Sequence, residues 1–268
     1  MTRSPDAVLA DIPGWEGAKY TRLTGGLTNK TWQVVHDGRI GVLKIDEAVR
    51  ELPFNTRCDE ALVQNAAAKA GLAPNVISAE DGMYFTQYVE GTVWGRNYFD
   101  EDSNLKLLAT ALKRVHSLPL TSRSFDATVA TKRYVADING LDSDVVEHCT
   151  STITSMCLPQ NLCCCHNDLV AENLITTPEL MFLDWEYACD NDPFFDLATI
   201  VEHHELSDSQ AEVLLNAYFD GDGLRGQKNL QRSRKLYLSL LCLWMASRSD
   251  VDAVALENVV ERIFTSCS

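Results

Sequence analysis

The chain has 268 residues, of which 46% are hydrophobic and 23% are charged, as in a soluble globular protein long enough for one large core or two lobes. Its formal net charge of −15 argues against a nucleic-acid partner, because such partners are bound largely through Lys and Arg on phosphates. The same charge disfavours an anionic membrane surface and is compatible with a cationic small molecule.

The beginning of the chain, MTRSPDAVLADIPGW, lacks the apolar stretch and the small-residue cleavage site of a signal peptide. The most apolar run, residues 236–246, is too short to span a bilayer and is typical of a buried helix. We therefore expect a cytoplasmic protein that does not enter a membrane. The nine cysteines agree with a reducing compartment, because an odd number without regular spacing is a poor disulfide framework.

The first third of the chain predicts strands and one helix. Residues 14–46 indicate three strands, separated by a glycine turn and by the turn at His36-Asp37-Gly38. The alanine-rich stretch 56–70 predicts a helix that ends at Gly71. Two further strands are expected at 76–79 and 83–88. Residues 1–90 are therefore expected to form an α+β lobe with an antiparallel sheet of about five strands.

From residue 104 the apolar period becomes helical, and residues 91–268 are expected to form a larger, mainly helical lobe. Leu105, Leu108, Leu112 and Val115 share one face of a helix that ends before Pro119. A second helix is predicted over 134–157, and a hairpin over 174–176 and 180–183. The last part of the chain predicts helices at 194–204, 207–219, 231–249 and 252–264.

Three adjacent cysteines precede a polar loop in the segment CCCHNDLVAENLI, which begins at Cys163. Structural zinc sites use cysteine pairs separated by two to four residues. Adjacent residues on a strand point to opposite faces, so Cys163, Cys164 and Cys165 cannot all face one ion. We interpret them as part of a short buried strand, in which cysteine serves as a small apolar residue.

The polar residues after these cysteines have a spacing with chemical meaning. Asp168 and Asn173 share one loop, and Asp184 ends the apolar stretch MFLD. Phosphoryl transfer needs a carboxylate beside the attacking hydroxyl, oxygen ligands for magnesium and positive charge on the phosphates. Asp168 suits the first task, and the oxygens of Asn173 and Asp184 suit Mg²⁺ better than zinc. The alternative is that these residues only form turns.

Longer motifs resemble those of the aminoglycoside phosphotransferase and choline kinase superfamily, relatives of the protein kinases. The resemblance covers nearly the whole chain and rests most firmly on HNDLVAENLI and FLDWEYACDNDPFFDLA. The other similar motifs are LTGGLTNKTWQV, VLKI, NTRCDEALVQNAAAKAGLAP and LLATALKRVHSLP. The resemblance implies a protein-kinase-like fold of two lobes, the cofactors ATP and Mg²⁺, and transfer of phosphate to a small-molecule alcohol. It is closest to the bacterial choline kinases and thiamine kinases.

The resemblance also implies roles for individual residues. Asp168 would be the catalytic base, Asn173 and Asp184 would bind magnesium, and Lys44 would contact phosphate with Glu60 orienting it. His166 and Asp196 would support the catalytic loop. The nucleotide would be held by the backbone near Gly25, Gly26 and Asn29, and adenine would dock on the hinge residues Gln87, Tyr88 and Val89.

The acceptor alcohol is less well defined by the sequence. The residues expected near a cationic acceptor are Glu186, Tyr187, Glu202 and Trp244. Each has a structural alternative: Trp244 lies in an apolar helix, Glu202 can pair with a nearby base, and Glu186 can order its loop. His203 and His204 are interpreted as surface residues.

Several readings of the function stay open at this level. Choline is the first candidate acceptor, followed by thiamine or ethanolamine and then by an aminoglycoside or sugar. Lys44 stands where many choline kinases have Arg, which brings the chain closer to the antibiotic kinases at that position. A non-catalytic binding protein is disfavoured, because Lys44, Asp168, Asn173 and Asp184 are all present. The sequence does not define an oligomeric state.

Overall fold

The structure is a computed structural model that describes residues 3–23, 29–50, 54–156 and 161–265. The chain forms two compact units. The first comprises Met1–Trp94 together with Ala171–Ala188, and the second comprises Gly95–Val170 together with Cys189–Ser268. The sequence places a boundary near residue 90, close to the end of the first segment, but assigns 171–188 to the second lobe.

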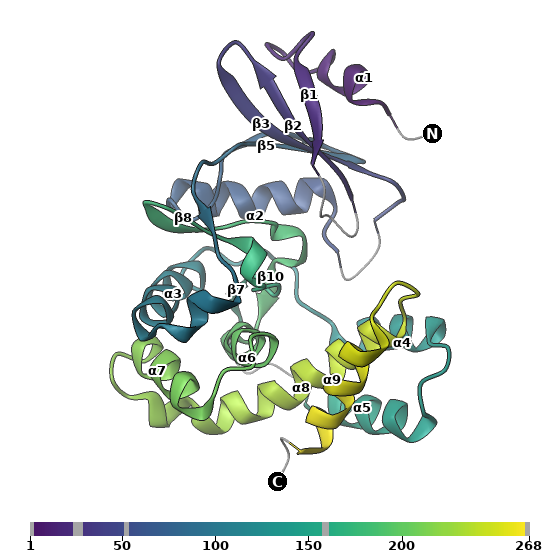
Figure 1. Cartoon of the computed structure of the whole chain (residues 1–268), viewed down its shortest axis with the longest axis vertical. Helices are drawn as coiled ribbons and strands as arrows, with labels where there is room; N and C mark the ends of the chain where they lie inside the picture. Colours follow the sequence, from purple (N-terminus) through teal and green to yellow (C-terminus); the bar gives the residue numbers. More distant parts are fainter. Residues whose placement is uncertain (1–2, 24–28, 51–53, 157–160, 266–268) are drawn as a thin grey trace. The chain divides into compact units, whose positions relative to one another are not determined.

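The first unit is built on a five-stranded antiparallel sheet, as the sequence predicts (Figure 1). Asp37 and Gly38 connect β2 to β3 with positive φ angles of 49° and 75°, as a tight hairpin turn requires. The strand order in the sheet is β1 (Lys19–Leu23), β2 (Asn29–His36), β3 (Arg39–Asp46), β5 (Met83–Gln87) and β4 (Val76–Glu80).

Strand β3 separates the core of this unit from its polar face. Leu43 and Ile45 are buried on one face, and the alternation of a strand puts Lys44 and Asp46 on the other. Gly41 is required here because a Cβ atom would lie 2.4 Å from the ring of Phe85. The short helix α1 (Pro5–Leu9), which the sequence analysis did not predict, contributes two buried residues to the same core cluster.

Helix α2 (Arg57–Lys69) lies where the sequence predicts it, with Thr56 as N-cap. A smaller sheet brings the segment Ala171–Ala188 into this unit: β8 (Leu174–Thr177) pairs with β6 (Thr92–Val93) on one side and with β9 (Glu179–Phe182) on the other. Short 3₁₀ helices flank this hairpin, η2 (Ala171–Asn173) before it and η3 (Trp185–Tyr187) after it.

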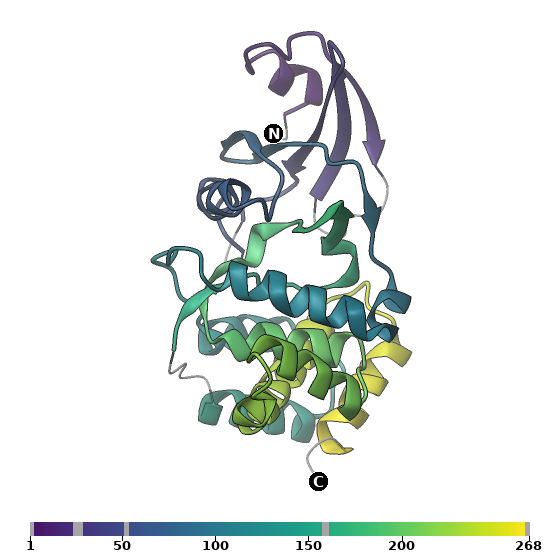
Figure 2. The same ribbon diagram turned by 90° about the vertical axis from the view of Figure 1, so that its left-hand side faces the viewer.

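The second unit is mainly helical (Figure 2). Helix α6 is buried from Phe194 to Glu202, which suits its place against α8, and α3 packs against α7. Its small sheet pairs β7 (Cys163–Cys165) with β10 (Cys189–Asn191). The helices described are η1 (Arg96–Asp100), α3 (Asp102–Val115), α4 (Ala127–Asp137), α5 (Ser143–Met156), α6 (Pro193–His203), α7 (Asp208–Tyr218), η4 (Gly223–Gly226), α8 (Gln227–Ala246) and α9 (Ala253–Thr265).

The prediction of a single helix over 134–157 is wrong, because α4 and α5 are separate. Ile138 leaves the helical conformation with φ −69° and ψ 129°, and Gly140 has a φ of 90°. Asp142 then accepts a hydrogen bond of 2.8 Å from the backbone N–H of Asp144 at the start of α5. Among the residues that the structure describes, no helix is both long and apolar enough to cross a membrane.

Candidate active site

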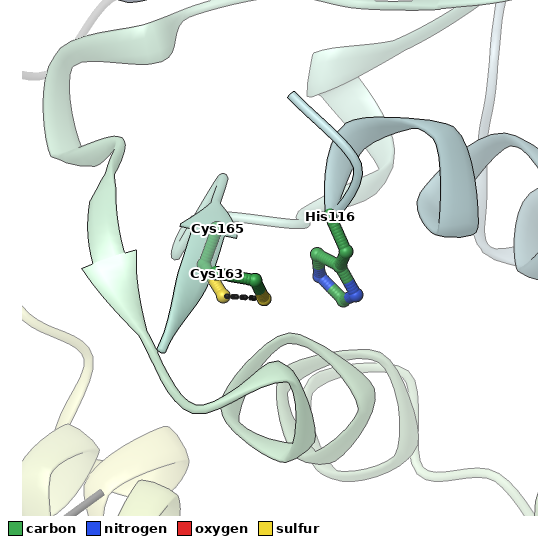
Figure 3. Close-up of side chains that lie close together, drawn as sticks. All are labelled: His116, Cys163 and Cys165. Carbon is green, nitrogen blue, oxygen red and sulfur yellow. Dashed lines mark hydrogen bonds between the residues drawn. The ribbon is translucent and has the colours of Figure 1, made fainter. Parts of the chain in front are cut away.

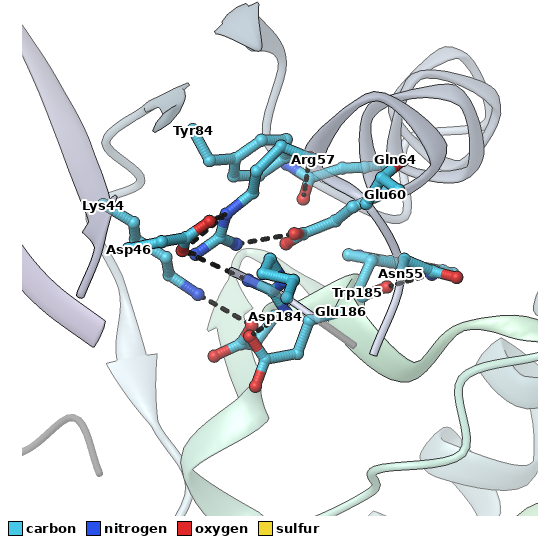
Figure 4. Close-up of polar contacts among 12 residues, drawn as sticks. Lys44, Asp46, Asn55, Arg57, Glu60, Gln64, Tyr84, Asp184, Trp185 and Glu186 are labelled. Carbon is cyan, nitrogen blue, oxygen red and sulfur yellow. Dashed lines mark hydrogen bonds and ion pairs between the residues drawn. The ribbon is translucent and has the colours of Figure 1, made fainter. Parts of the chain in front are cut away.

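The first unit brings Lys44 of β3 against Asp184, the residue that follows β9. The Lys44 Nζ lies 2.7 Å from Asp184 Oδ1 (Figure 4). Burial lowers the pKa of Lys44, but the carboxylates of Asp184, Glu60 and Glu186 outweigh this effect and hold the pKa above its usual value. Lys44 is therefore a cation at neutral pH, as a phosphate contact must be.

A buried arginine organises the polar face behind this pair. Arg57 is 1% exposed and donates to Glu60 Oε2 at 2.7 Å and to the carboxylate of Asp46. Its guanidinium also lies 5.5 Å from the ring centre of Tyr84, whose hydroxyl donates to Gln64 Oε1 at 3.0 Å. Arg57, Glu60 and Gln64 are spaced along one face of α2.

Glu60 therefore forms its ion pair with Arg57, whereas the sequence analysis expected it to orient Lys44. Its charge still reaches Lys44, because it contributes to the raised pKa of that ammonium. Burial raises the pKa of Glu60 itself, against the attraction of Arg57 and Lys44. Sequence reasoning missed Arg57, although an arginine three residues before a helical glutamate is a signal for such a pair.

The segment after Asp184 is fixed by residues that precede α2. Glu186 is 5% exposed and accepts an ion pair of 2.8 Å from Arg50. Asn55 makes three hydrogen bonds to the same turn, from its backbone N–H to Glu186 O at 2.7 Å and from Nδ2 to Ala188 O at 2.8 Å and Trp185 O at 3.3 Å. The ring of Tyr187 packs on Phe54 with ring centres 4.5 Å apart. These contacts agree with the structural alternative, in which Glu186 orders its loop, and its role near the acceptor stays a prediction.

The two candidate metal ligands belong to the same unit. Asn173, which ends η2, is 9% exposed, and its carbonyl oxygen accepts a hydrogen bond of 2.8 Å from the N–H of Leu183, the residue before Asp184. Asp184 has a left-handed backbone with φ 60°. An amide oxygen and a carboxylate are hard donors that fit Mg²⁺.

The expected nucleotide segments are described only in part. Gly25 and Gly26 lie outside the described residues, and Asn29 is described only as the first backbone position of β2. At the hinge, the N–H of Gln87 donates to Asn75 O at 2.8 Å and the N–H of Tyr88 donates to Ile40 O at 3.0 Å. Tyr88 is 37% exposed, and with Gln87 and Val89 it lines a hollow on the first unit.

The predicted catalytic loop lies in the second unit. Asp168 is half-buried. Burial, and then the carboxylate of Asp168, raise the pKa of Tyr237 on α8. Asp196, fully buried on α6, accepts the N–H of His166 at 2.9 Å and the N–H of Asn167 at 2.7 Å. The expectation that Asp196 holds this loop is confirmed.

His204 also supports the loop, and its interpretation as a surface residue is wrong. It is 3% exposed, stacks on Phe99 with ring centres 3.6 Å apart, and donates from Nε2 to Leu169 O at 2.9 Å. Burial, and then the neighbouring His203, lower the pKa of His204 to about 3. His203 is exposed, with Nδ1 at 3.2 Å from the Tyr237 hydroxyl.

Two residues predicted near the acceptor already have cationic neighbours. Glu202 is 2% exposed, and Arg234 and Arg262 both form ion pairs with its carboxylate. Trp244 is half-buried, and the guanidinium of Arg248 lies 5.1 Å from its ring centre. The carboxylate of Glu202 is therefore neutralised, whereas the ring of Trp244 accepts a cation on its face.

Comparisons with known proteins give a consistent result. The family described as "Phosphotransferase enzyme family" matches residues 19–227. Protein LicA of Haemophilus influenzae is 31% identical over 207 residues, which are 72% of this chain and 61% of that protein. The chain thus spans less than two thirds of the length of that relative.

Solved structures of similar proteins extend the likeness to three dimensions. A choline/ethanolamine kinase family protein from Mesorhizobium loti is 26% identical, with a TM-score of 0.76 over 97% of this chain and 92% of that one. A structure of LicA in complex with AMP is 20% identical, with a TM-score of 0.76 over 97% and 96% of the two chains. Both likenesses show the fold, and the second protein binds a nucleotide.

Proposed function

We infer that this chain, which belongs to the phosphotransferase enzyme family, is a kinase that transfers the γ-phosphate of ATP to the hydroxyl of a small cationic alcohol, with choline as the first candidate. The observation that carries this proposal is the juxtaposition of Lys44 and Asp184 at 2.7 Å. A phosphate-binding cation and a magnesium-binding carboxylate on one polar face are what phosphoryl transfer from a nucleotide requires.

Each residue is assigned the role that suits its chemistry. Lys44 contacts the phosphates, and Asn173 and Asp184 supply oxygen ligands to Mg²⁺, which when bound adds positive charge beside the phosphates. Asp168 orients the acceptor hydroxyl and accepts its proton. Arg57 holds Glu60 and Asp46 in place around Lys44, and Asp196 holds the backbone that precedes Asp168.

Three observations support a cationic acceptor. The chain carries a net charge of −15, which attracts cations at long range. Trp244 offers a partly accessible ring that already engages the guanidinium of Arg248. A similar solved structure is described as a choline/ethanolamine kinase family protein. The same description makes ethanolamine the second candidate.

Glu202 is a weaker candidate for the acceptor site than the sequence suggests. Its carboxylate is paired with two arginines, so a bound cation would have to compete with both. We propose a supporting role for it, in which it joins α6 to α8 and α9. A direct role in cation binding would instead make Glu202→Gln raise the KM for the acceptor with little loss of thermal stability.

The test is Mg²⁺-dependent release of ADP from ATP with choline, ethanolamine, thiamine and an aminoglycoside, each at a range of concentrations. The proposal expects choline to give the highest kcat/KM and expects Asp168→Asn to lower the acceptor-dependent release by about 10²–10⁴. A chain that binds ATP but releases no ADP with any of these alcohols would overturn it. A preference for the aminoglycoside would retain the kinase and overturn the proposed acceptor.

A further inference from the structure

Three potential metal ligands of nitrogen and sulfur meet in the second unit, whereas the magnesium candidates belong to the first. His116, which caps α3, faces Cys163 and Cys165 of β7 (Figure 3). One ligand atom from each of the three residues lies within 4.8 Å of the other two. Residues i and i+2 of a strand share a face, so Cys164 points away from this cluster.

The two sulfur atoms have the spacing of ligands to one tetrahedral ion. Cys163 Sγ and Cys165 Sγ are 3.6 Å apart. Two thiolates at a zinc–sulfur distance of about 2.3 Å in a tetrahedral site lie about 3.8 Å apart. Strand β7 alone therefore places the two sulfur atoms close to the separation that two ligands of one tetrahedral ion require.

The imidazole is held in the tautomer that a metal ligand needs. His116 Nε2 lies 3.0 Å from Asp196 Oδ2, and because a carboxylate only accepts hydrogen bonds, Nε2 carries the proton. The lone pair is then on Nδ1, which accepts a hydrogen bond of 2.6 Å from the hydroxyl of Tyr218, so an ion bound to Nδ1 would replace this hydrogen bond. A histidine whose other nitrogen donates to a carboxylate is the usual arrangement at protein metal sites.

We propose that His116, Cys163 and Cys165 bind one borderline-soft divalent ion of the zinc class, with the fourth ligand from Tyr218 or from solvent. Thiolate and imidazole donors select such an ion over Mg²⁺, so this site and the magnesium ligands do not compete for the same metal. Cys165 is buried and Cys163 is half-buried, which leaves the site one partly open side. The proposal does not depend on the proposed kinase function.

Asp196 connects this site to the catalytic loop. The Oδ2 atom that faces His116 also accepts the N–H of His166, and Oδ1 accepts the N–H of Asn167. An ion bound to His116 therefore holds its imidazole ring in place against the carboxylate of Asp196. We expect the bound ion to raise the melting temperature of the chain.

The test is a titration of the reduced, metal-stripped full chain with Cd²⁺, in excess Mg²⁺ so that oxygen sites are filled. Charge-transfer absorption from sulfur to cadmium reports thiolate binding alone. We expect saturation at one ion per chain, displacement of Cd²⁺ by Zn²⁺, and a rise in melting temperature with Zn²⁺. Cys163 is a direct ligand in this proposal. Cys163→Ser should therefore weaken binding by more than the roughly 10–100-fold that is lost when a residue that only hydrogen-bonds to a ligand is replaced.

The chain offers matched controls. Cys164→Ala changes the adjacent cysteine on the opposite face of the strand, and Cys149→Ala removes a buried thiol of α5, so both should bind as the wild type does. Cys163 is the half-exposed member of the pair, so its serine variant is expected to fold even if Cys165→Ser does not. Absence of saturable absorption in the wild type, or equal binding by Cys163→Ser, would overturn the proposal.

Discussion

The ammonium of Lys44 lies 2.7 Å from Oδ1 of Asp184, so the candidate phosphate contact and the candidate magnesium ligand neutralise each other. Both side chains are largely buried, and the pair is therefore only weakly screened by salt. In the proposed function, a nucleotide with its metal would compete for both groups, because phosphate attracts the ammonium and Mg²⁺ attracts the carboxylate. This relationship gives each residue a distinct and measurable part in binding.

The first prediction concerns the metal ligand. Asp184→Asn should abolish the Mg²⁺ dependence of ATP binding, because the carboxylate is lost. Binding of ATP without Mg²⁺ should be retained or tightened, since Lys44 is released from its partner. Isothermal calorimetry with and without Mg²⁺ measures both effects. An unchanged dependence on Mg²⁺ would contradict the assignment of Asp184.

The second prediction separates chemistry from binding. Asp168→Ala should lower kcat by about 10²–10⁴, the range that a positioned general base contributes, and should leave ATP affinity nearly unchanged. Asp208→Ala is a control, because the side chain of Asp208 is 98% exposed. If ATP affinity collapses together with turnover in Asp168→Ala, Asp168 is not acting as the base.

Much of this organisation could be predicted from the sequence, because local patterns determine it. The alternation of β3 and the capped helix α2 are both visible in the residues, and the predicted family, kinase-like fold and phosphotransferase class are confirmed. One failure is local and another is long-range. The Arg57–Glu60 pair is an i,i+3 contact within α2 that the sequence already contains, whereas the burial of His204 depends on Phe99, which is distant in sequence.

The metal cluster shows the same limit. The sequence analysis interpreted all three cysteines as packing residues, because only one residue separates Cys163 from Cys165 whereas structural zinc sites use a separation of two to four, and the proposed site departs from that interpretation. His116 comes from a different helix, and nothing in the segment around β7 identifies it. The turn at Gly140 that separates α4 from α5 was missed for a local reason, because apolar residues at helical spacing continue on both sides of it.

The third prediction is that the buried ion pair of Arg57 contributes more to the free energy of unfolding than an exposed ion pair does. Arg57→Met leaves the fully buried Glu60 without its partner and should lower the free energy of unfolding by about 3–5 kcal/mol. Arg96→Met is the matched control, since the Arg96–Asp100 side chains are 50% and 61% exposed, and it should cost about 0–1 kcal/mol. Urea denaturation measures both.

A double variant tests the reason for this cost. If the penalty comes from the unpaired carboxylate, Arg57→Met combined with Glu60→Met should recover most of the lost stability. Equal stability of the single and double variants would mean that the contacts of Arg57 with Asp46 and Tyr84 are the larger contribution.

The last prediction is a pH dependence that arises from His204. Its pKa is lowered from 6.5 to about 3 in the folded chain, so below pH 6.5 the unfolded chain binds a proton that the folded chain does not. Stability contributed by the neutral ring is therefore present above pH 6.5 and falls as the pH decreases toward 3. Each pH unit in that window costs up to about 1.4 kcal/mol, or about 2 kcal/mol at pH 5.

His204→Gln removes this proton linkage, and its amide can still donate to the carbonyl of Leu169. The variant should lose stability at pH 7 through the missing stack on Phe99, but its free energy of unfolding should fall less than that of the wild type between pH 7 and pH 5. His203→Gln leaves the His204 ring buried and removes only the smaller cause of its low pKa, so this comparison variant should keep most of the wild-type slope. Parallel slopes for His204→Gln and the wild type would mean that folding does not lower the pKa of His204, which would contradict this prediction.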